Sequence, residues 1–180
     1  MRRVPERGRI GLFNRSYYEE VLVTRVHPEL LAAQKLPSPP NGKRFWKERF
    51  EDINAFERHL VRNGTLVIKF YLHLSKEEQR NRLLARLDDP NKHWKFSLSD
   101  LKERAHWDDY IKAYEETLQH TSTEEAPWYI IPADHKWLCH LLVSEILCRS
   151  LETLKLKYPR TDDAKKADLI AARALLESET

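Results

Sequence analysis

Short runs of almost continuously apolar residues, each followed by helical periodicity, constrain the fold of this chain more than any other feature. They occupy Arg9–Phe13, Thr65–Leu72 and Trp128–Ile131. Runs of this kind without regular polar alternation are typical of strands buried on both faces, as in parallel sheets covered by helices. The alternation of strand and helix patterns therefore predicts an α/β fold, with a mostly parallel sheet and flanking helices.

Helix starts and helical spacing fill the segments between the expected strands. Ser75 followed by Glu78, and Ser97 followed by Asp100, are typical of helix N-termini because each pair can satisfy free backbone N–H groups. The aromatic residues at helical spacing indicate core packing rather than a cofactor site. We expect helices at Tyr17–Val26, Trp46–Leu60, Ser99–Thr121 and His135–Leu156.

Length and composition indicate one globular domain. The chain has 180 residues, of which 41% are hydrophobic and 33% are charged. We place the domain at residues 1–160 and read residues 161–180, rich in Ala, Lys and Glu, as a helical or disordered tail. No apolar stretch approaches the roughly 20 residues that a membrane span needs, so we expect a cytoplasmic protein. Cys139 and Cys148 lie on opposite faces of one expected helix and cannot pair.

Positive charge is concentrated between Arg80 and Lys95. This segment holds five Lys and Arg residues against two carboxylates, whereas the net charge of the whole chain is only +3. One interpretation is a solvated basic helix face, which is common. A break at Pro90 and the placement of Trp94 between two lysines favour the other interpretation, a surface that binds anions. We expect neither nucleic acid nor a membrane as a partner.

Residues that follow the expected strands are the first candidates for a binding site, because parallel sheets bind ligands beyond the carboxyl ends of their strands. Arg15 is the strongest of them, since its guanidinium presents a rigid set of donors that matches phosphate oxygens. The alternative for Arg15 is an ion pair with Glu19 or Glu20, one helical turn away. His73 and His135 are more typical of structural histidines.

Several blocks of the sequence together resemble the type-2 polyphosphate kinase family, over about Arg7 to Tyr158. The resemblance implies a P-loop-kinase-like fold of the thymidylate kinase type, with a helical lid at about residues 80–106. It also implies phosphoryl transfer between inorganic polyphosphate and AMP or ADP, with Mg²⁺. The blocks that carry it are Gly11–Val23, Asn63–Phe70, Ser75–Arg80, Lys92–Lys95 and Trp128–Lys136.

Carried over residue by residue, the resemblance assigns Asn14 and Arg15 to the catalytic centre. Arg15 would hold a phosphoryl oxygen, and the Asn14 amide would orient a phosphate or a water. An amide brings no negative charge, so we assign no metal ligand in this chain and Mg²⁺ would need others. Lys69 would face the phosphate channel or reach the surface. The lid residues implied to bind polyphosphate or nucleotide are Arg80, Arg86, Lys92, Lys95 and Arg104.

One departure from the family pattern is large. The family carries a phosphate-binding loop of the form G-x-D-x-x-G-K, and this sequence, with only four glycines, contains no such motif. That loop supplies backbone N–H groups and a lysine on which phosphoryl transfer depends. The strand leading into it would lie between Arg9–Phe13 and Thr65–Leu72. The opening residues 1–5 read like an internal linker of a longer protein.

We therefore expect the N-terminal strands of the sheet to be missing, leaving unpaired strand edges. The outcomes we expect are a three-stranded remnant sheet or a complex, with a separately encoded P-loop-containing N-terminal half or as a homo-oligomer. Two functions remain open. The chain is part of a polyphosphate-dependent nucleotide kinase that works only when completed, or it is a non-catalytic polyphosphate-binding or interaction module.

Overall fold

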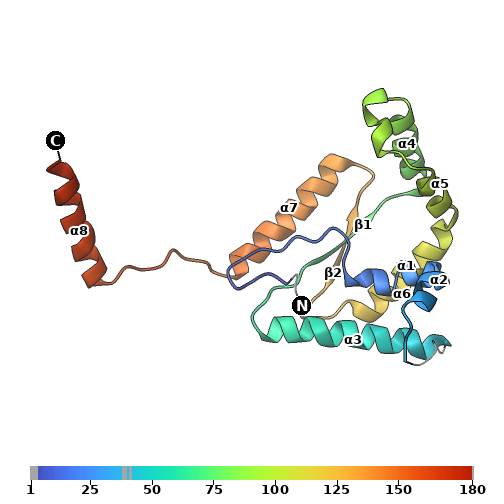
Figure 1. Cartoon of the computed structure of the whole chain (residues 1–180), viewed down its shortest axis with the longest axis horizontal. Helices are drawn as coiled ribbons and strands as arrows, with labels where there is room; N and C mark the ends of the chain where they lie inside the picture. Colours follow the sequence, from blue (N-terminus) through green and yellow to red (C-terminus); the bar gives the residue numbers. More distant parts are fainter. Residues whose placement is uncertain (1–3, 38–39, 41, 180) are drawn as a thin grey trace. The chain divides into compact units, whose positions relative to one another are not determined.

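The computed structural model describes residues 4–37, 40 and 42–179, and the expected linker residues 1–3 lie outside them. The chain forms two compact units, which divide between His140 and Leu141. The first unit is mixed α/β and contains both strands (Figure 1). It also contains every residue of the hydrophobic core cluster.

Strands β1 (Lys69–His73) and β2 (Trp128–Pro132) pair in parallel, with Lys69 opposite Trp128 and His73 opposite Pro132. The parallel arrangement expected from the two apolar runs is confirmed for this pair. β1 begins four residues later than the apolar run that predicted it, because only Lys69–His73 has a partner strand alongside. The sheet has two strands in the described part of the chain.

The prediction of a strand at Arg9–Phe13 is wrong for the described structure. These residues form no strand, and their apolar side chains are exposed: Ile10 by 82%, Leu12 by 92% and Phe13 by 54%. A strand is stable only beside a partner that shares its backbone hydrogen bonds, and neither described strand pairs with residues 9–13. The expected three-stranded remnant sheet is therefore not formed by the described residues.

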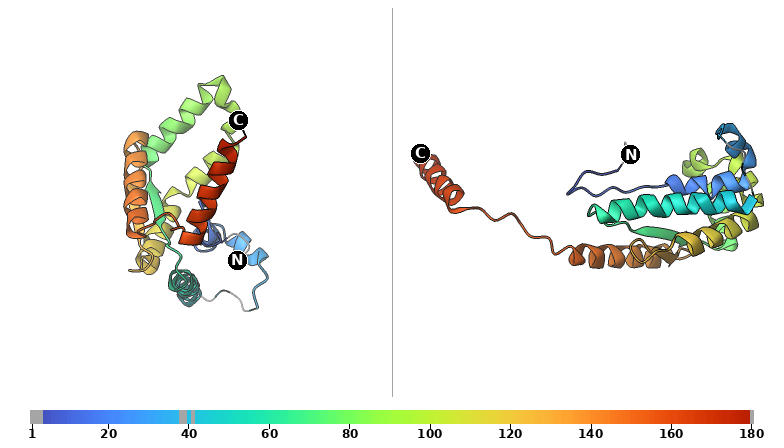
Figure 2. Two further views of the ribbon diagram at one scale, coloured as in Figure 1. Left: turned by 90° about the vertical axis from the view of Figure 1, so that its left-hand side faces the viewer. Right: turned by 90° about the horizontal axis from the view of Figure 1, so that it is seen from below.

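The core lies between short N-terminal helices and two longer ones. The 3-10 helix η1 (Tyr17–Glu20), α1 (Val23–Val26) and α2 (Pro28–Ala33) cover the segment expected to be helical at 17–26 and extend beyond it. α3 (Gly42–Arg62) packs against η1 and α6 (Trp107–Thr121) (Figure 2). Residues buried together are Tyr18, Val21, Leu22, Phe50, Ile53 and Ala113.

Helices α4 (Lys76–Leu87), η2 (Pro90–Lys95) and α5 (Leu98–Ala105) form a segment that we call the arm (Figure 1). The Ser75 cap is confirmed, since its Oγ accepts from the Glu78 N–H at 3.0 Å. Ser97 and Asp100 form the expected capping box at the start of α5. The single helix expected at Ser99–Thr121 is divided into α5 and α6 at His106, whose backbone leaves the helical region.

The second unit contains most of α7 (Lys136–Thr153) and all of α8 (Asp163–Glu177). No residue of α8 is buried, in keeping with the weak apolar periodicity of this segment. Cys139 is buried and Cys148 is exposed, and both are free thiols. In the described residues we found no helix with the length and apolar character required to cross a membrane.

Candidate functional site

The carboxyl ends of the two strands are joined to the beginning of the arm. The Ser75 N–H donates to Asp134 Oδ1 at 2.7 Å, and this backbone hydrogen bond holds the pKa of the Asp134 carboxyl below its usual value. The Arg82 Nη2 donates to the carbonyls of Ala133 and Asp134, at 2.6 and 3.0 Å. The arm therefore starts from a fixed point beside the sheet edge, where ligands bind in parallel folds.

The Asn14–Arg15–Ser16 turn lies between the exposed segment 9–13 and η1. The Arg15 backbone has φ +69°, in the left-handed region that residues other than glycine seldom adopt. Its side chain is 78% exposed and pairs with Glu19, Nη1 to Oε1 at 3.3 Å, which is the alternative that the sequence offered. Burial raises the pKa of Tyr110 and Tyr114 on α6, and the positive charge of Arg15 opposes that rise.

Three of the five arm cations proposed to bind substrate are engaged within the arm. Arg104 Nη1 donates to the Lys76 carbonyl at 2.7 Å and to Gln79 Oε1 at 2.8 Å, which ties α5 to α4. Arg86 faces Asp100 at 3.9 Å, and Lys92 pairs with Asp89 at 2.6 Å. The Arg104 and Arg86 contacts join α5 to α4, whereas the Lys92 pair lies within η2 and its N-cap.

The other two arm cations present their charge outward. Lys95 Nζ lies 4.9 Å from the centroid of the Trp94 ring, and the Trp94 side chain is itself 79% exposed. Arg80 makes no hydrogen bond or ion pair with any residue that the structure describes. It lines, with Arg104, a shallow apolar pocket between α4 and α5. Among these five cations, Arg80 and Lys95 are therefore the ones that can bind an anion without first losing an ion pair or hydrogen bond.

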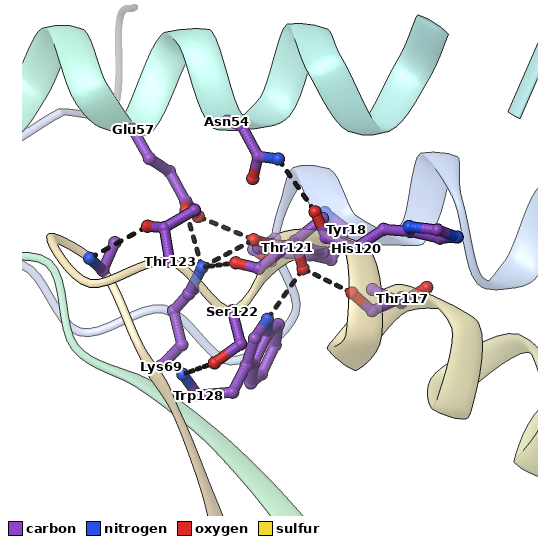
Figure 3. Close-up of polar contacts among 12 residues, drawn as sticks. Tyr18, Asn54, Glu57, Lys69, Thr117, His120, Thr121, Ser122, Thr123 and Trp128 are labelled. Carbon is purple, nitrogen blue, oxygen red and sulfur yellow. Dashed lines mark hydrogen bonds and ion pairs between the residues drawn. The ribbon is translucent and has the colours of Figure 1, made fainter. Parts of the chain in front are cut away.

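The sequence suggested that the Lys69 side chain faces a phosphate channel or reaches the surface, and the structure places it elsewhere. Its ammonium is buried at the start of β1 and donates three hydrogen bonds, to Glu57 Oε2 at 2.6 Å, to the Tyr18 hydroxyl at 2.9 Å and to the Thr121 carbonyl at 2.8 Å (Figure 3). Burial lowers the pKa of Lys69, and the Glu57 carboxylate opposes that shift. All three ammonium protons thus bind protein oxygens rather than a phosphate channel or solvent.

Glu57 and Tyr18 were not singled out from the sequence, although a signal for Glu57 was present. Glu57 lies seven residues after Phe50 and four after Ile53, which places it on the buried face of α3. Lys69 interrupts an apolar strand in the same way. Two opposite charges at positions expected to be buried predict that they meet, because an isolated buried charge is very costly.

Ligands for a divalent cation are not gathered in the described part of the chain. Within residues 4–37, 40 and 42–179 no group of three or more His, Cys, Asp or Glu side chains lies close enough to hold a metal ion. Asn14 is exposed and contributes an uncharged amide. The described residues therefore form no preassembled site for the Mg²⁺ that the resemblance implies, and we derive no step through it.

A parallel strand pair joined to a basic helical arm defines a mixed α/β protein with several exposed cations near the carboxyl ends of its strands. A sequence profile described as polyphosphate kinase 2 (PPK2) matches residues 1–159. The chain therefore belongs to the PPK2 family. Its structure is similar to that of polyphosphate kinase 2 from Arthrobacter aurescens, with a TM-score of 0.83 and 42% identity over 95% of this chain and 57% of that one.

Two of the similar proteins are named for a phosphotransferase activity. An ADP-polyphosphate phosphotransferase from Rhodopseudomonas palustris is 53% identical over 176 residues, which cover 97% of this chain and 61% of the relative. An AMP/ADP-polyphosphate phosphotransferase from Meiothermus ruber is 46% identical over 167 residues, which cover 93% of this chain and 58% of the relative. The chain thus spans about three fifths of the length of these two relatives.

Proposed function

We propose that this chain transfers phosphoryl groups between inorganic polyphosphate and AMP or ADP when a P-loop-containing segment completes it. The names of the two relatives support the reaction and the substrates. The absence of a G-x-D-x-x-G-K motif from the sequence supports the need for completion, because that loop supplies the phosphate cradle. We infer that β1 and β2 then belong to a larger parallel sheet of the thymidylate kinase type.

The observation that carries this proposal is the uncovered apolar segment beside the candidate site. Ile10, Leu12 and Phe13 are 82%, 92% and 54% exposed. A folded protein seldom exposes consecutive large apolar residues unless a partner covers them. The family resemblance places the P-loop strand between this segment and β1. A strand supplied there would pair with both neighbours and bring the phosphate-binding loop beside Arg15.

In the completed enzyme the chain's own residues bind and orient phosphate. Arg15 would exchange Glu19 for a phosphoryl oxygen, and Asn14 would orient it through its amide. Arg80 and Lys95 would bind the phosphate chain directly, and Arg86 and Lys92 would join them by exchanging their exposed carboxylates, while Arg104 holds α5 to α4. Such positioning and charge neutralisation account for most of the catalysis of phosphoryl transfer.

The decisive experiment measures ATP formation from polyphosphate and ADP, and ADP formation from polyphosphate and AMP, with Mg²⁺ in the buffer. The chain is assayed alone and with the N-terminal part of the Rhodopseudomonas palustris relative. We expect activity only with the added part, and loss of that activity in Arg15→Gln. Equal activity of the chain alone would contradict the need for completion.

The alternative function, a polyphosphate-binding module without catalysis, is favoured by Arg80 and Lys95, which form no ion pair with any described residue and are present whether or not the sheet is completed. It would be supported by salt-sensitive polyphosphate binding without turnover under either condition. No binding and no turnover would reject both functions.

A further inference from the structure

The turn that carries Arg15 needs an external support. Arg15 adopts a left-handed backbone conformation, and the residues before it make no strand. After it comes η1, a 3-10 helix of only four residues, which is too short to be stable by itself. Within the turn, the local contacts are the Ser16 cap on the Tyr18 N–H, the hydrogen bond from the Glu19 N–H to the Ser16 carbonyl at 3.2 Å, and the ion pair of Arg15 with Glu19.

Two consecutive tyrosines attach η1 to a helix that is distant in sequence. The hydroxyls of Tyr17 and Tyr18 both donate to one oxygen, Oε1 of Glu57 on α3, at 2.7 and 2.8 Å. Tyr18 is 4% exposed and Tyr17 is 38% exposed. Since both bonds end on the same carboxylate oxygen, the position of Glu57 fixes the first two residues of η1 directly after Ser16.

Lys69 fixes Glu57 in turn. Its ammonium binds the second carboxylate oxygen, Oε2, at 2.6 Å, and also the Tyr18 hydroxyl and the Thr121 carbonyl at the end of α6 (Figure 3). Every ammonium proton of Lys69 and both oxygens of Glu57 are thereby used. A buried polar network in which every group is satisfied is rigid and specifies one geometry.

We propose that Tyr17 and Tyr18 are positioning residues, which transmit the geometry of the Glu57–Lys69 pair to the Asn14–Arg15 turn. The network holds the turn in place without contacting substrate. The importance of this network for phosphoryl transfer rests on the proposed function, in which Arg15 binds phosphate. The effect of the network on the turn is independent of that function.

The test replaces only the two hydroxyls, in Tyr17→Phe/Tyr18→Phe, with Tyr158→Phe as the matched control because Tyr158 is 97% exposed. Trypsin is added under native conditions, and the products are identified by mass. We expect cleavage after Arg15 to become about fivefold faster, since local opening controls proteolysis of a folded chain. Cleavage after Arg58, within α3, reports loss of the fold and should stay unchanged.

Equal rates after Arg15 in the variant and the control would overturn the proposal, and so would a parallel increase after Arg58. If the double variant folds poorly, Tyr17→Phe alone serves, because the Tyr17 ring is already partly exposed. It should still accelerate cleavage after Arg15 about twofold, in keeping with the loss of one of two anchoring bonds.

A second readout uses the reconstituted enzyme. The double variant should lower kcat about tenfold while leaving the KM for polyphosphate unchanged, because the arm proposed to bind polyphosphate is not altered. A changed KM with unchanged kcat would contradict a positioning role. If the unaltered protein shows no turnover but the variant is cleaved faster after Arg15, the anchor is supported and the proposed function fails.

Discussion

Lys69 and the arm cations are chemically alike but lie in opposite surroundings. The Lys69 side chain is 6% exposed and has three protein oxygens as partners. Arg86 and Lys92 are 39% and 51% exposed, and each faces one carboxylate, Asp100 and Asp89 respectively. The first arrangement fixes a geometry, whereas the second leaves cations that can exchange a carboxylate for another anion at small cost.

This difference shows that the burial of a cationic side chain, rather than its charge, decides whether it is available to a ligand. A buried ion pair holds its partners because removing either one strands the other in a medium of low polarity. An exposed pair loses little when it opens, because water and salt solvate both charges. We therefore expect the cations that build the site and those that bind the ligand to be separate sets.

The largest effect should come from Lys69→Met. This change leaves the buried Glu57 carboxylate without its cation, which typically costs about 3–5 kcal/mol of unfolding free energy. Urea unfolding of the first unit, followed by Trp fluorescence, measures it. Adding Glu57→Gln in the same chain should recover much of the loss. A loss below about 1 kcal/mol in the single variant would show that the buried pair is not structurally important.

The next effect concerns ligand binding. Arg80→Glu/Lys95→Glu should weaken polyphosphate binding about tenfold and flatten its dependence on salt, because two attractive charges become repulsive. Binding is measured by titration at two salt concentrations. Lys47→Glu, on an exposed position of α3, is the control and should change affinity little. Equal losses in both variants would mean that the arm has no special role.

We expect the stability of the contact between α5 and the rest of the first unit to depend on pH. His27 lies between two carboxylates, with Nε2 3.0 Å from Glu103 on α5 and Nδ1 3.1 Å from Glu29. The hydrogen bond with Glu103 is the main reason that the pKa of His27 lies above its usual 6.5. His106 and Tyr110, whose hydroxyl donates to Glu103, also face this group.

Because the folded protein holds the His27 proton more tightly, this contact is fully stabilising below about pH 6.5 and weakens as the pH rises through the raised pKa. Hydrogen exchange of α5, corrected for its intrinsic pH dependence, should show protection that falls modestly between pH 6 and 8. In His27→Gln that fall should disappear. The same fall in both proteins would assign the pH dependence to another group.

The smallest effect should be that of Lys92→Ala. Removing this exposed partner of Asp89 should change the unfolding free energy by less than about 1 kcal/mol, in contrast to Lys69→Met. Asp89 keeps a second contact, since its Oδ1 accepts from the Asn91 N–H at 3.0 Å. The same urea titration measures both variants. A loss similar to that of Lys69→Met would remove the distinction between the two kinds of cation.

Local chemistry could be predicted from the sequence, whereas non-local pairing could not. The caps at Ser75 and Ser97 were predictable because their partners lie three residues or fewer away. The segment 9–13 has a strand-like composition but no strand beside it, and partners are not encoded in composition. The break at His106 contains neither Pro nor Gly, so no local signal marked it.

The candidate site shows the same division. The exposure of the Asn14–Arg15 turn and the ion pair with Glu19 follow from neighbours in sequence. The position of Lys69 depends on Glu57, Tyr18 and Thr121, which arrive from three different elements. Only a comparison of buried-face positions on α3 and β1 could have indicated that two opposite charges meet in the core.

The parallel pairing of β1 with β2 also bears on how quickly the chain folds. All of α4, η2, α5 and α6 lies between the two strands, so Lys69 can meet Trp128 only after this long segment has closed into a loop. Closing a long loop costs entropy before any strand contact compensates for it, and high contact order slows folding. The helices of the arm form from local contacts, so we expect them to be in place first, with strand pairing as the late and rate-limiting event.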